Sequence, residues 1–263
     1  MARAKSSLSQ FAKPASPPLT DAARRTPPAA LAIFAKAPIP GEVKTRLCPP
    51  LTPDEAATLH GSFVLDMLEQ TKRAVVTLQL PCDRYLACAP ASNLVFFKIM
   101  EERQGVRLLD QVGEDLGQRM HHTFIDLFAK GYKQVILVGT DVPTLPLSVY
   151  QEALAILSRS DVVLGPALDG GYYLIGLTRP AERLFAGVPW STDEVLAITQ
   201  HNAKTLGLSV GLTTAWRDVD TIVDLQALIA DCREDAKKPK QGRTFSMRTT
   251  GALQLLETRL KTR

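Results

Sequence analysis

The 263-residue sequence lacks any run of about 20 apolar residues, the length a helix needs to cross a bilayer, so we expect no transmembrane helix. Its first twenty residues contain basic groups but no apolar core, which argues against a secretory signal peptide. Cysteine is scarce, and the spacing of Cys48, Cys82, Cys88 and Cys232 fits neither a zinc site nor a dithiol redox motif. Scattered single thiols fit a reducing compartment, so we expect a cytoplasmic protein.

A large excess of charge of one sign is confined to the two ends of the chain. Segments 1–28 and 233–263 together hold 14 basic and 4 acidic residues, a net charge of +10, whereas the whole chain carries +4. The intervening body, 29–232, therefore carries −6, which disfavours nucleic-acid binding. The basic run 237–240 fits either a solvated loop or a surface touching RNA or lipid, and composition favours the loop.

The first 28 residues are rich in proline, alanine and serine and have no apolar period, which predicts a flexible extension. A transit peptide, with its acid-poor and serine-rich composition, is the alternative. The apolar content of the chain is 45%, an ordinary value for globular proteins. Residues 29–263 are therefore expected to form a single domain with a sizeable core and no internal repeat.

Strand-like apolar runs alternate with helical patterns through this domain. The predicted strands are 31–34, 75–78, 85–88, 106–109, 135–138, 162–164 and 172–177. Such alternation predicts the α/β class, with a Rossmann-like, mostly parallel sheet and helices on both faces. Sheets of this kind bind ligands beyond the carboxyl ends of their strands.

Capping patterns mark several helix starts between the strands. Thr52-Pro53-Asp54-Glu55 combines a cap, a first-turn proline and a capping box, and Ser191-Thr192-Asp193-Glu194 resembles a second box. Either Asp220 or Thr221 is expected to cap a helix that begins near Ile222. Further helices are predicted at 116–128, 145–157 and 249–260.

A basic loop follows the first predicted strand. Lys36, Lys44 and Arg46 lie within eleven residues, beside the turn residue Gly41. Ammonium and guanidinium groups stabilise phosphate oxygens, so these four residues are candidates for nucleotide or phosphate binding. The loop lacks the ending of a Walker A motif, and an ordinary solvated surface is an equally open interpretation.

Two acidic residues are candidate metal ligands. Asp141 follows the buried strand 135–138, and Pro143 keeps the chain from entering a helix at once. At a strand end, Asp141 is placed to ligate Mg²⁺ or Mn²⁺, both oxygen-seeking ions, or to act in catalysis. Asp220 is a candidate second ligand. An Asx-turn or helix cap is the alternative for each.

The run Asp169-Gly170-Gly171-Tyr172 puts a carboxylate and two glycines directly before an apolar strand. Asp169 is a candidate catalytic residue that orients an acceptor hydroxyl or acts as its general base, although a plain turn is the alternative. Gly170, Gly171 and Tyr172 are candidate substrate-binding residues. Trp190, between Pro189 and Ser191, is either a stacking platform for a sugar or base or a core anchor.

Taken in order, seven motifs spread over residues 31–262 resemble a known family. They are 34–38, 41–47, 115–120, 139–143, 165–177, 189–192 and 218–221, and Asp169-Gly170-Gly171-Tyr172-Tyr173 is the most specific segment. The family is the bacterial group of GT-A-like glycosyltransferases called radical-SAM/selenodomain-associated transferases, some of them named for arsenosugar biosynthesis. Thr140 and Val142 flank Asp141, so the Asp-x-Asp pair of many GT-A enzymes is absent and metal dependence stays open.

The resemblance implies a nucleotide-diphospho-sugar transferase fold in which Lys36, Lys44 and Arg46 meet phosphates. It also implies that Asp141 and Asp220 stand where related enzymes bind a metal. Three functions follow as hypotheses. The first is sugar transfer from a nucleotide sugar to a small acceptor. The second is nucleotidyl transfer from an NTP, as in phospholactate guanylyltransferases and molybdopterin nucleotidyltransferases, and the third is nucleotide binding without catalysis.

Overall fold

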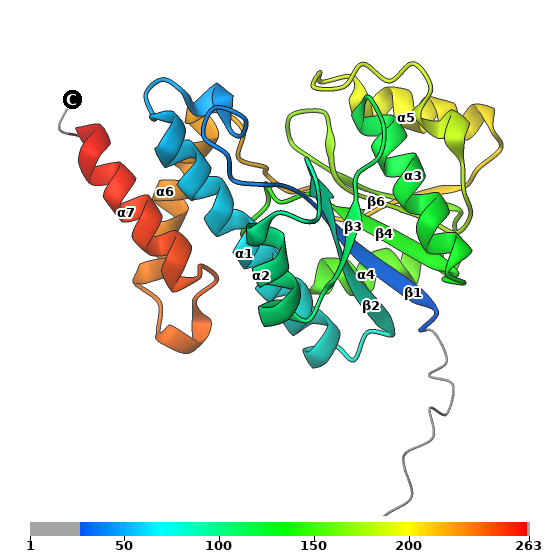
Figure 1. The fold of residues 1–263 in the computed structure, drawn as a ribbon, viewed down its shortest axis with the longest axis horizontal. Coiled ribbons are helices and arrows are strands. Elements are labelled where there is room, and N and C mark those ends of the chain that lie inside the picture. Colours follow the sequence, from blue (N-terminus) through cyan, green and yellow to red (C-terminus); the bar gives the residue numbers. More distant parts are fainter. Residues whose placement is uncertain (1–26, 262–263) are drawn as a thin grey trace, which may run out of the picture.

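The structure is a computed structural model, and residues 27–261 of it are described here (Figure 1). The predicted extension at 1–28 lies outside the described residues, apart from its last two positions. Within them, seven strands form one sheet in the order β3-β2-β1-β4-β6-β5-β7. The strands are β1 (Ala29–Lys36), β2 (Cys82–Ala89), β3 (Arg107–Asp110), β4 (Gln134–Val138), β5 (Val162–Pro166), β6 (Tyr172–Leu177) and β7 (Val210–Leu212).

All neighbouring strands run parallel except for β6, which is antiparallel to both β4 and β5. The helices are α1 (Pro53–Thr77), α2 (Val95–Gln104), α3 (Leu116–Ala129), α4 (Ser148–Leu157), α5 (Val195–Thr205), α6 (Ile222–Ala236) and α7 (Met247–Lys261). Three short 3-10 turns complete the set: η1 (Thr45–Leu47), η2 (Glu182–Phe185) and η3 (Lys240–Gly242). These elements confirm the predicted fold class, a mostly parallel α/β sheet.

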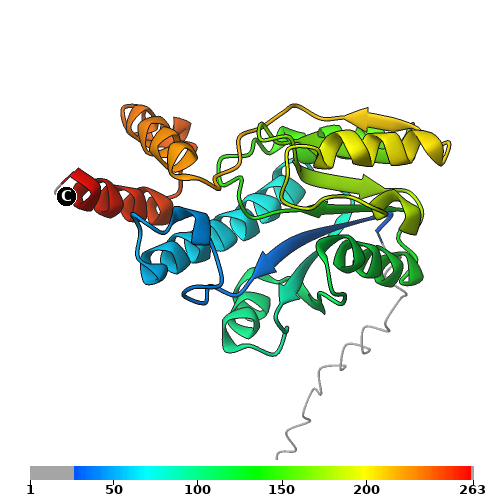
Figure 2. The ribbon, with the colours of Figure 1, turned by 90° about the horizontal axis from the view of Figure 1, so that it is seen from above.

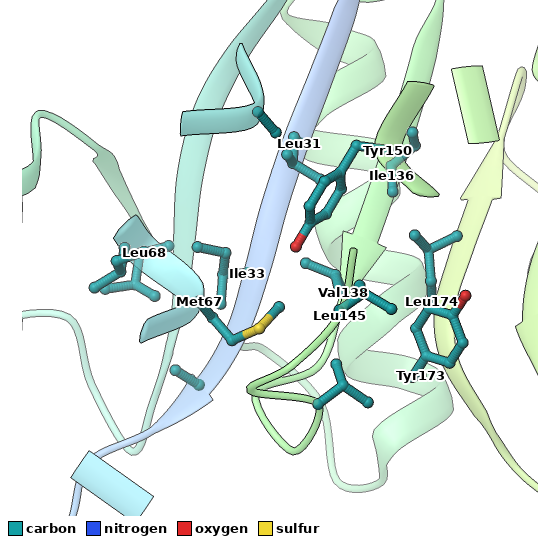
Figure 3. Packing of buried hydrophobic residues seen from close by; sticks show 14 of the residues in the cluster. Leu31, Ile33, Met67, Leu68, Ile136, Val138, Leu145, Tyr150, Tyr173 and Leu174 are labelled. Atoms are coloured by element: carbon teal, nitrogen blue, oxygen red, sulfur yellow. The ribbon is translucent and has the colours of Figure 1, made fainter. Parts of the chain in front are cut away.

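Side-chain alternation along the strands divides the core into two layers. Leu31 and Ile33 of β1 point to the face covered by α1, α2 and α4, where Figure 3 shows Ile33 near Met67 and Leu31 near Tyr150. Ala30 and Ala32 point to the opposite face, which α3, η2 and α5 cover. Because both faces are buried, the central strands read as continuous apolar runs.

A third apolar cluster lies beyond the edge of the sheet. Helices α6 and α7 pack beside the amino-terminal part of α1 and stand apart from the strands (Figures 1 and 2). This cluster also contains Leu47 of η1 and Val219, which precedes α6. The two segments that carry Lys44 and Asp220 are therefore anchored in one core.

Two predicted helix starts are confirmed by their caps, and one predicted strand is wrong. Thr52 and Glu55 form the predicted capping box at the start of α1, and Thr221 caps α6 with Asp224. The predicted strand at 75–78 is wrong, because α1 continues to Thr77 and keeps Ala74 against the core.

The predicted capping box at Ser191–Glu194 is also wrong: α5 begins at Val195 without a side-chain cap. Instead, the Thr192 hydroxyl donates to Pro189 O (2.8 Å), and the backbone N–H of Leu196 donates to Gly170 O at 2.9 Å. The first turn of α5 is thus tied to the loop before β6. No helix within residues 27–261 is long and apolar enough to cross a bilayer.

Candidate active-site cleft

A cleft of about 440 Å³ lies at the edge of the sheet where β1, β4 and β5 end and β6 begins. Because β6 is antiparallel, its amino end meets the carboxyl ends of its neighbours, which brings Asp169 to the same edge as Lys36 and Asp141. The sequence-predicted residues that line the cleft are Lys36, Lys44, Arg46, Asp141, Asp169, Gly171, Tyr172, Trp190 and Asp220. Gly41 and Gly170 are not among the lining residues.

Lys44 is the most buried charged side chain in the cleft, at 5% exposed. Its ammonium lies 2.6 Å from Asp141 Oδ1 and 2.8 Å from Asp220 Oδ1, and it donates to Val219 O at 2.7 Å. Burial acts to lower the pKa of Lys44, but Asp141 and Asp220 outweigh burial and raise it. All of its polar contacts in the structure go to protein oxygens, so the ammonium joins the two carboxylates rather than facing open space.

The backbone at Lys44 supports this arrangement. Its φ of 49° and ψ of 36° lie in the left-handed region, which costs a non-glycine residue about 1 kcal/mol. The strain is offset by the three contacts that the left-handed turn allows the ammonium to make. Gly41, also at positive φ (83°), has no atom within 4 Å of where its Cβ would stand. Gly41 therefore serves the turn itself.

The other two predicted cations are more open. Lys36 is exposed at the end of β1, and the Arg46 side chain is 61% exposed, with only a long contact of 3.6 Å to Asp220 Oδ2. The positions of Lys36 and Arg46 leave their charged groups available to an anion in the cleft.

Three carboxylates crowd the opposite side of the cleft. Asp169, Asp218 and Asp220 each offer an oxygen, and these oxygens lie within 4.8 Å of one another. Burial, followed by the charges of Asp169 and Asp220, raises the pKa of Asp218 to about 7. Neither Asp169 nor Asp218 has an ion pair within residues 27–261. The group is therefore short of positive charge.

These carboxylates fit a divalent ion in the chemistry of their donors, because Mg²⁺ and Mn²⁺ prefer carboxylate oxygens. Asp220 is one of the two ligands predicted from sequence. The other, Asp141, is held by Lys44, whose attraction lowers the pKa of Asp141 despite burial. Asp218 is the member of the cluster that the sequence does not single out as a ligand, although it lies in the motif 218–221.

Asp169 sits in a tight turn before β6. Its Oδ1 accepts a hydrogen bond from the backbone N–H of Gly171 at 2.9 Å, which confirms the turn but leaves the carboxylate exposed. Gly170 has φ of 92°, and a Cβ there would lie 2.2 Å from Asp193 O. Its glycine is therefore required by the loop before α5 rather than by a ligand. Gly171 lines the cleft directly.

Aromatic residues form the wall beside Asp169. Trp190 is half-buried and lines the cleft, and a Cβ at Gly117 would lie 2.7 Å from its Cζ2 atom. The indole therefore packs on the start of α3 and also lines the cavity; its role as a stacking platform stays a prediction. Tyr172 lines the same wall, and burial raises the pKa of its hydroxyl.

His60 of α1 is a second cleft residue that sequence reasoning did not identify. Its side chain is 5% exposed, and Nε2 lies 3.0 Å from Lys36 O. A carbonyl only accepts, so Nε2 carries the proton and Nδ1 presents a lone pair with no hydrogen-bond partner in the described residues. Burial lowers the pKa of His60, although Asp141 opposes this. A lone histidine in an apolar helical stripe carried no signal in the sequence.

A smaller recess of about 420 Å³ adjoins the cleft on its cationic side and shares Lys36, Glu42 and Gln111 with it. Arg119 of α3 also lines this recess, with Nε donating to Gly113 O at 3.0 Å. Gln111 donates to Ala87 O at 2.8 Å. The cationic side therefore extends toward the ends of β2 and β3, whereas the carboxylates lie toward β5, β6 and β7.

Two known proteins are similar to the chain in sequence. A solved structure, "putative nucleotide-diphospho-sugar transferase" from Desulfovibrio desulfuricans G20, is 32% identical, has a TM-score of 0.75 and covers 89% of this chain and 97% of its own. The "2-phospho-L-lactate guanylyltransferase" of Methanothermobacter thermautotrophicus is 28% identical over 190 residues, 71% of this chain and 78% of its own.

A CMP:2-keto-3-deoxy-manno-octonic acid synthetase, solved with CTP, shares the fold alone: it is 12% identical, with a TM-score of 0.50 over 79% of this chain and 99% of its own. Residues 72–192 match the family model described as "Uncharacterized protein conserved in bacteria (DUF2064)". That segment runs from within α1 to the loop after Trp190 and includes Asp141 and Asp169. The chain therefore matches the DUF2064 model over residues 72–192, belongs to one family with the Desulfovibrio protein, and has the fold of the nucleotide-diphospho-sugar transferases.

Proposed function

We propose that the protein is a glycosyltransferase that moves a sugar from a nucleotide-diphosphate sugar to a small acceptor. One observation carries this proposal: exposed cations and an exposed carboxylate, Lys36, Arg46 and Asp169, line one cleft at the ends of the strands. A diphosphate needs positive charge as it departs, and an acceptor hydroxyl needs a base. The cleft offers both.

The residues divide the work. Lys36 and Arg46 bind the diphosphate, and Asp169 orients the acceptor hydroxyl or takes its proton. Lys44 holds Asp141 and Asp220 in position. A Mg²⁺ or Mn²⁺ ion, held by Asp169, Asp218 and Asp220, would supply further neutralisation of the leaving diphosphate.

The relatives support transfer chemistry. The Desulfovibrio protein is named for nucleotide-diphospho-sugar transfer. The narrower grouping with radical-SAM/selenodomain-associated transferases, the cytoplasmic location and the single-domain organisation remain predictions from the sequence.

Nucleotidyl transfer is the second candidate, favoured by the similarity to the guanylyltransferase. The same cations would then face the α-phosphate of an NTP, and pyrophosphate would be released. An acceptor of the phospholactate kind carries both a phosphate and a carboxylate, so this candidate also requires cations on the acceptor side.

The experiment is a mass-spectrometric screen of nucleotide sugars and NTPs with small acceptors, with and without Mn²⁺. Release of nucleoside diphosphate together with a glycosylated product is the expected result. Pyrophosphate and a nucleotidylated product would replace this proposal with the second. Nucleotide binding without turnover, unchanged by chelator or by Asp141→Ala, would favour a non-catalytic module.

A further inference from the structure

The two sides of the cleft differ in charge in a way that bears on the acceptor. The lining residues from the β5, β6 and β7 side include Asp169, Asp218 and Asp220, and no lysine, arginine or histidine among the residues that the structure describes. The cations Lys36 and Arg46 come from β1 and the loop that follows it. Lys44 reaches across, but Asp141 and Asp220 already neutralise its charge.

The two arginines that lie near these carboxylates in the sequence pair with carboxylates outside the cleft. Arg217 directly precedes Asp218, yet its guanidinium pairs with Asp231 of α6 at 3.2 Å. Arg179, in the loop after β6, lies 3.7 Å from Asp161 and does not line the cleft. A divalent ion among the three carboxylates would still leave one negative charge in excess. Within residues 27–261, Arg46 is the one cation besides Lys44 that reaches this group, 3.6 Å from Asp220 Oδ2, and in the proposed function it binds the diphosphate. An anionic acceptor that meets the cleft with the diphosphate bound would therefore be repelled.

The remaining groups on this side suit hydroxyls and an apolar ring face. Ser191 and Thr192 line the cleft beside Trp190, and Ser191 is a non-glycine residue at φ of 69°. Carboxylates and hydroxyls together form the hydrogen bonds that a polyol requires, and an indole face covers the C–H surface of a sugar ring.

We infer that the acceptor is a polyol without phosphate or carboxylate groups, either uncharged or bearing a protonated amine. This inference rests on the proposed function, since it names the second substrate of the same cleft. It separates the protein from enzymes whose acceptors are phosphorylated acids.

Three hexoses of the same ring but different charge test the inference: glucose, glucosamine and glucose 6-phosphate. Their affinities are measured by calorimetry on the full chain at neutral pH, where the amine of glucosamine is mostly protonated and glucose 6-phosphate is anionic. Pyrophosphate is present to occupy the cationic side, and the series is repeated with Mg²⁺. Glucosamine is expected to bind at least tenfold more tightly than glucose 6-phosphate, with glucose between them; Mg²⁺ narrows the gap without reversing it.

Asp169→Asn is expected to reduce glucosamine affinity roughly tenfold, as loss of a charge-assisted contact predicts, and to reduce glucose affinity less, because the asparagine oxygen can still accept a hydrogen bond from a hydroxyl. Asp193→Asn is the matched control, because Asp193 is exposed nearby but does not line the cleft. Equal affinities, unmeasurable binding of all three, or a preference for glucose 6-phosphate would overturn the inference. Discrimination among hexoses without product from any donor would leave it standing and refute the proposed transferase instead.

Discussion

Two polar clusters stand at opposite edges of the same sheet and use similar residue types. At the edge where β2 and β3 begin, Asp83 accepts from Tyr132 Oη at 2.6 Å and pairs with Arg107 at 2.9 Å. Tyr85 and Tyr132 join hydroxyls at 2.9 Å, and the Arg107 guanidinium lies over the Tyr85 ring. At the cleft edge, Lys44 pairs with Asp141 and Asp220, whereas Asp169 and Asp218 form no ion pair with any cation of residues 27–261.

The difference separates structural from functional polarity. In the Asp83 cluster the carboxylate, the guanidinium and both phenols have partners, so the cluster ties strands together and has no need of a ligand. In the cleft, three carboxylates crowd together and are only partly paired, and exposed cations line the same cavity. Such incomplete charge pairing favours the binding of a charged ligand. The two edges carry similar charged residues and differ in how completely those residues are paired.

The largest effect is expected from Asp169→Asn. The asparagine oxygen can still accept from Gly171, so the turn and the folded stability persist while the base is lost. Turnover in the assay that detects product should fall about 10²-fold or more. Asp83→Asn, at the opposite edge, is the contrasting variant and should weaken stability without slowing turnover. Comparable slowing by both would erase the distinction between the edges.

Lys44→Met should lower the free energy of unfolding by about 2–3 kcal/mol, because it leaves Asp141 and Asp220 facing each other without a cation. Urea unfolding measures the loss. Adding Asp141→Asn to the variant should restore part of it. Lys36→Met, which removes an exposed cation, should leave stability within about 0.5 kcal/mol and weaken nucleotide binding instead. The reverse pattern would make Lys44 a phosphate ligand.

The raised pKa of Asp218 predicts a pH dependence of stability in the presence of a chelator. A carboxyl whose folded pKa of about 7 exceeds its unfolded value binds its proton more tightly when folded, so stability is lost as pH rises from about 4 to 7 and is flat above. Asp218→Asn should remove this slope and raise stability above pH 7 by about 1–2 kcal/mol after allowance for solvent screening. Added Mg²⁺ should also flatten the slope of the unaltered protein. A slope that survives Asp218→Asn would belong to another group.

The smallest effect is expected from Tyr132→Phe. The change removes the hydrogen bonds that the Tyr132 hydroxyl makes with Asp83, Tyr85 and Arg107 but leaves the Arg107–Asp83 ion pair, so the unfolding free energy should fall by about 1 kcal/mol. Nucleotide affinity and turnover should not move. A change in either would mean that the opposite edge communicates with the cleft.

The fold and one side of the cleft could be predicted because their signals are local. The apolar run at 172–177 coincides with β6, and the capping box at Thr52 begins α1 as expected. Asp141 follows a buried strand, and the end of a parallel strand fixes the edge at which it lies.

What could not be predicted depends on contacts between distant residues. Lys44 and Asp220 are 176 positions apart, so no spacing indicated that the Lys44 ammonium would contact carboxylates. Gly170 is required by the backbone of Asp193, and Asp218 lies near Asp169 in a fold where β7 pairs with β5. β7 has only three residues, too few to show a period.

The bond from Val219 N–H to Asp141 O, 2.9 Å long, has a consequence for biosynthesis. This hydrogen bond joins the end of β4 to a segment that the ribosome makes about eighty residues later. A nascent chain that ends before this segment already contains the basic loop and β4, yet Lys44 has only one of its three oxygen partners. The cleft can be completed only late in translation, when the last helices are being made.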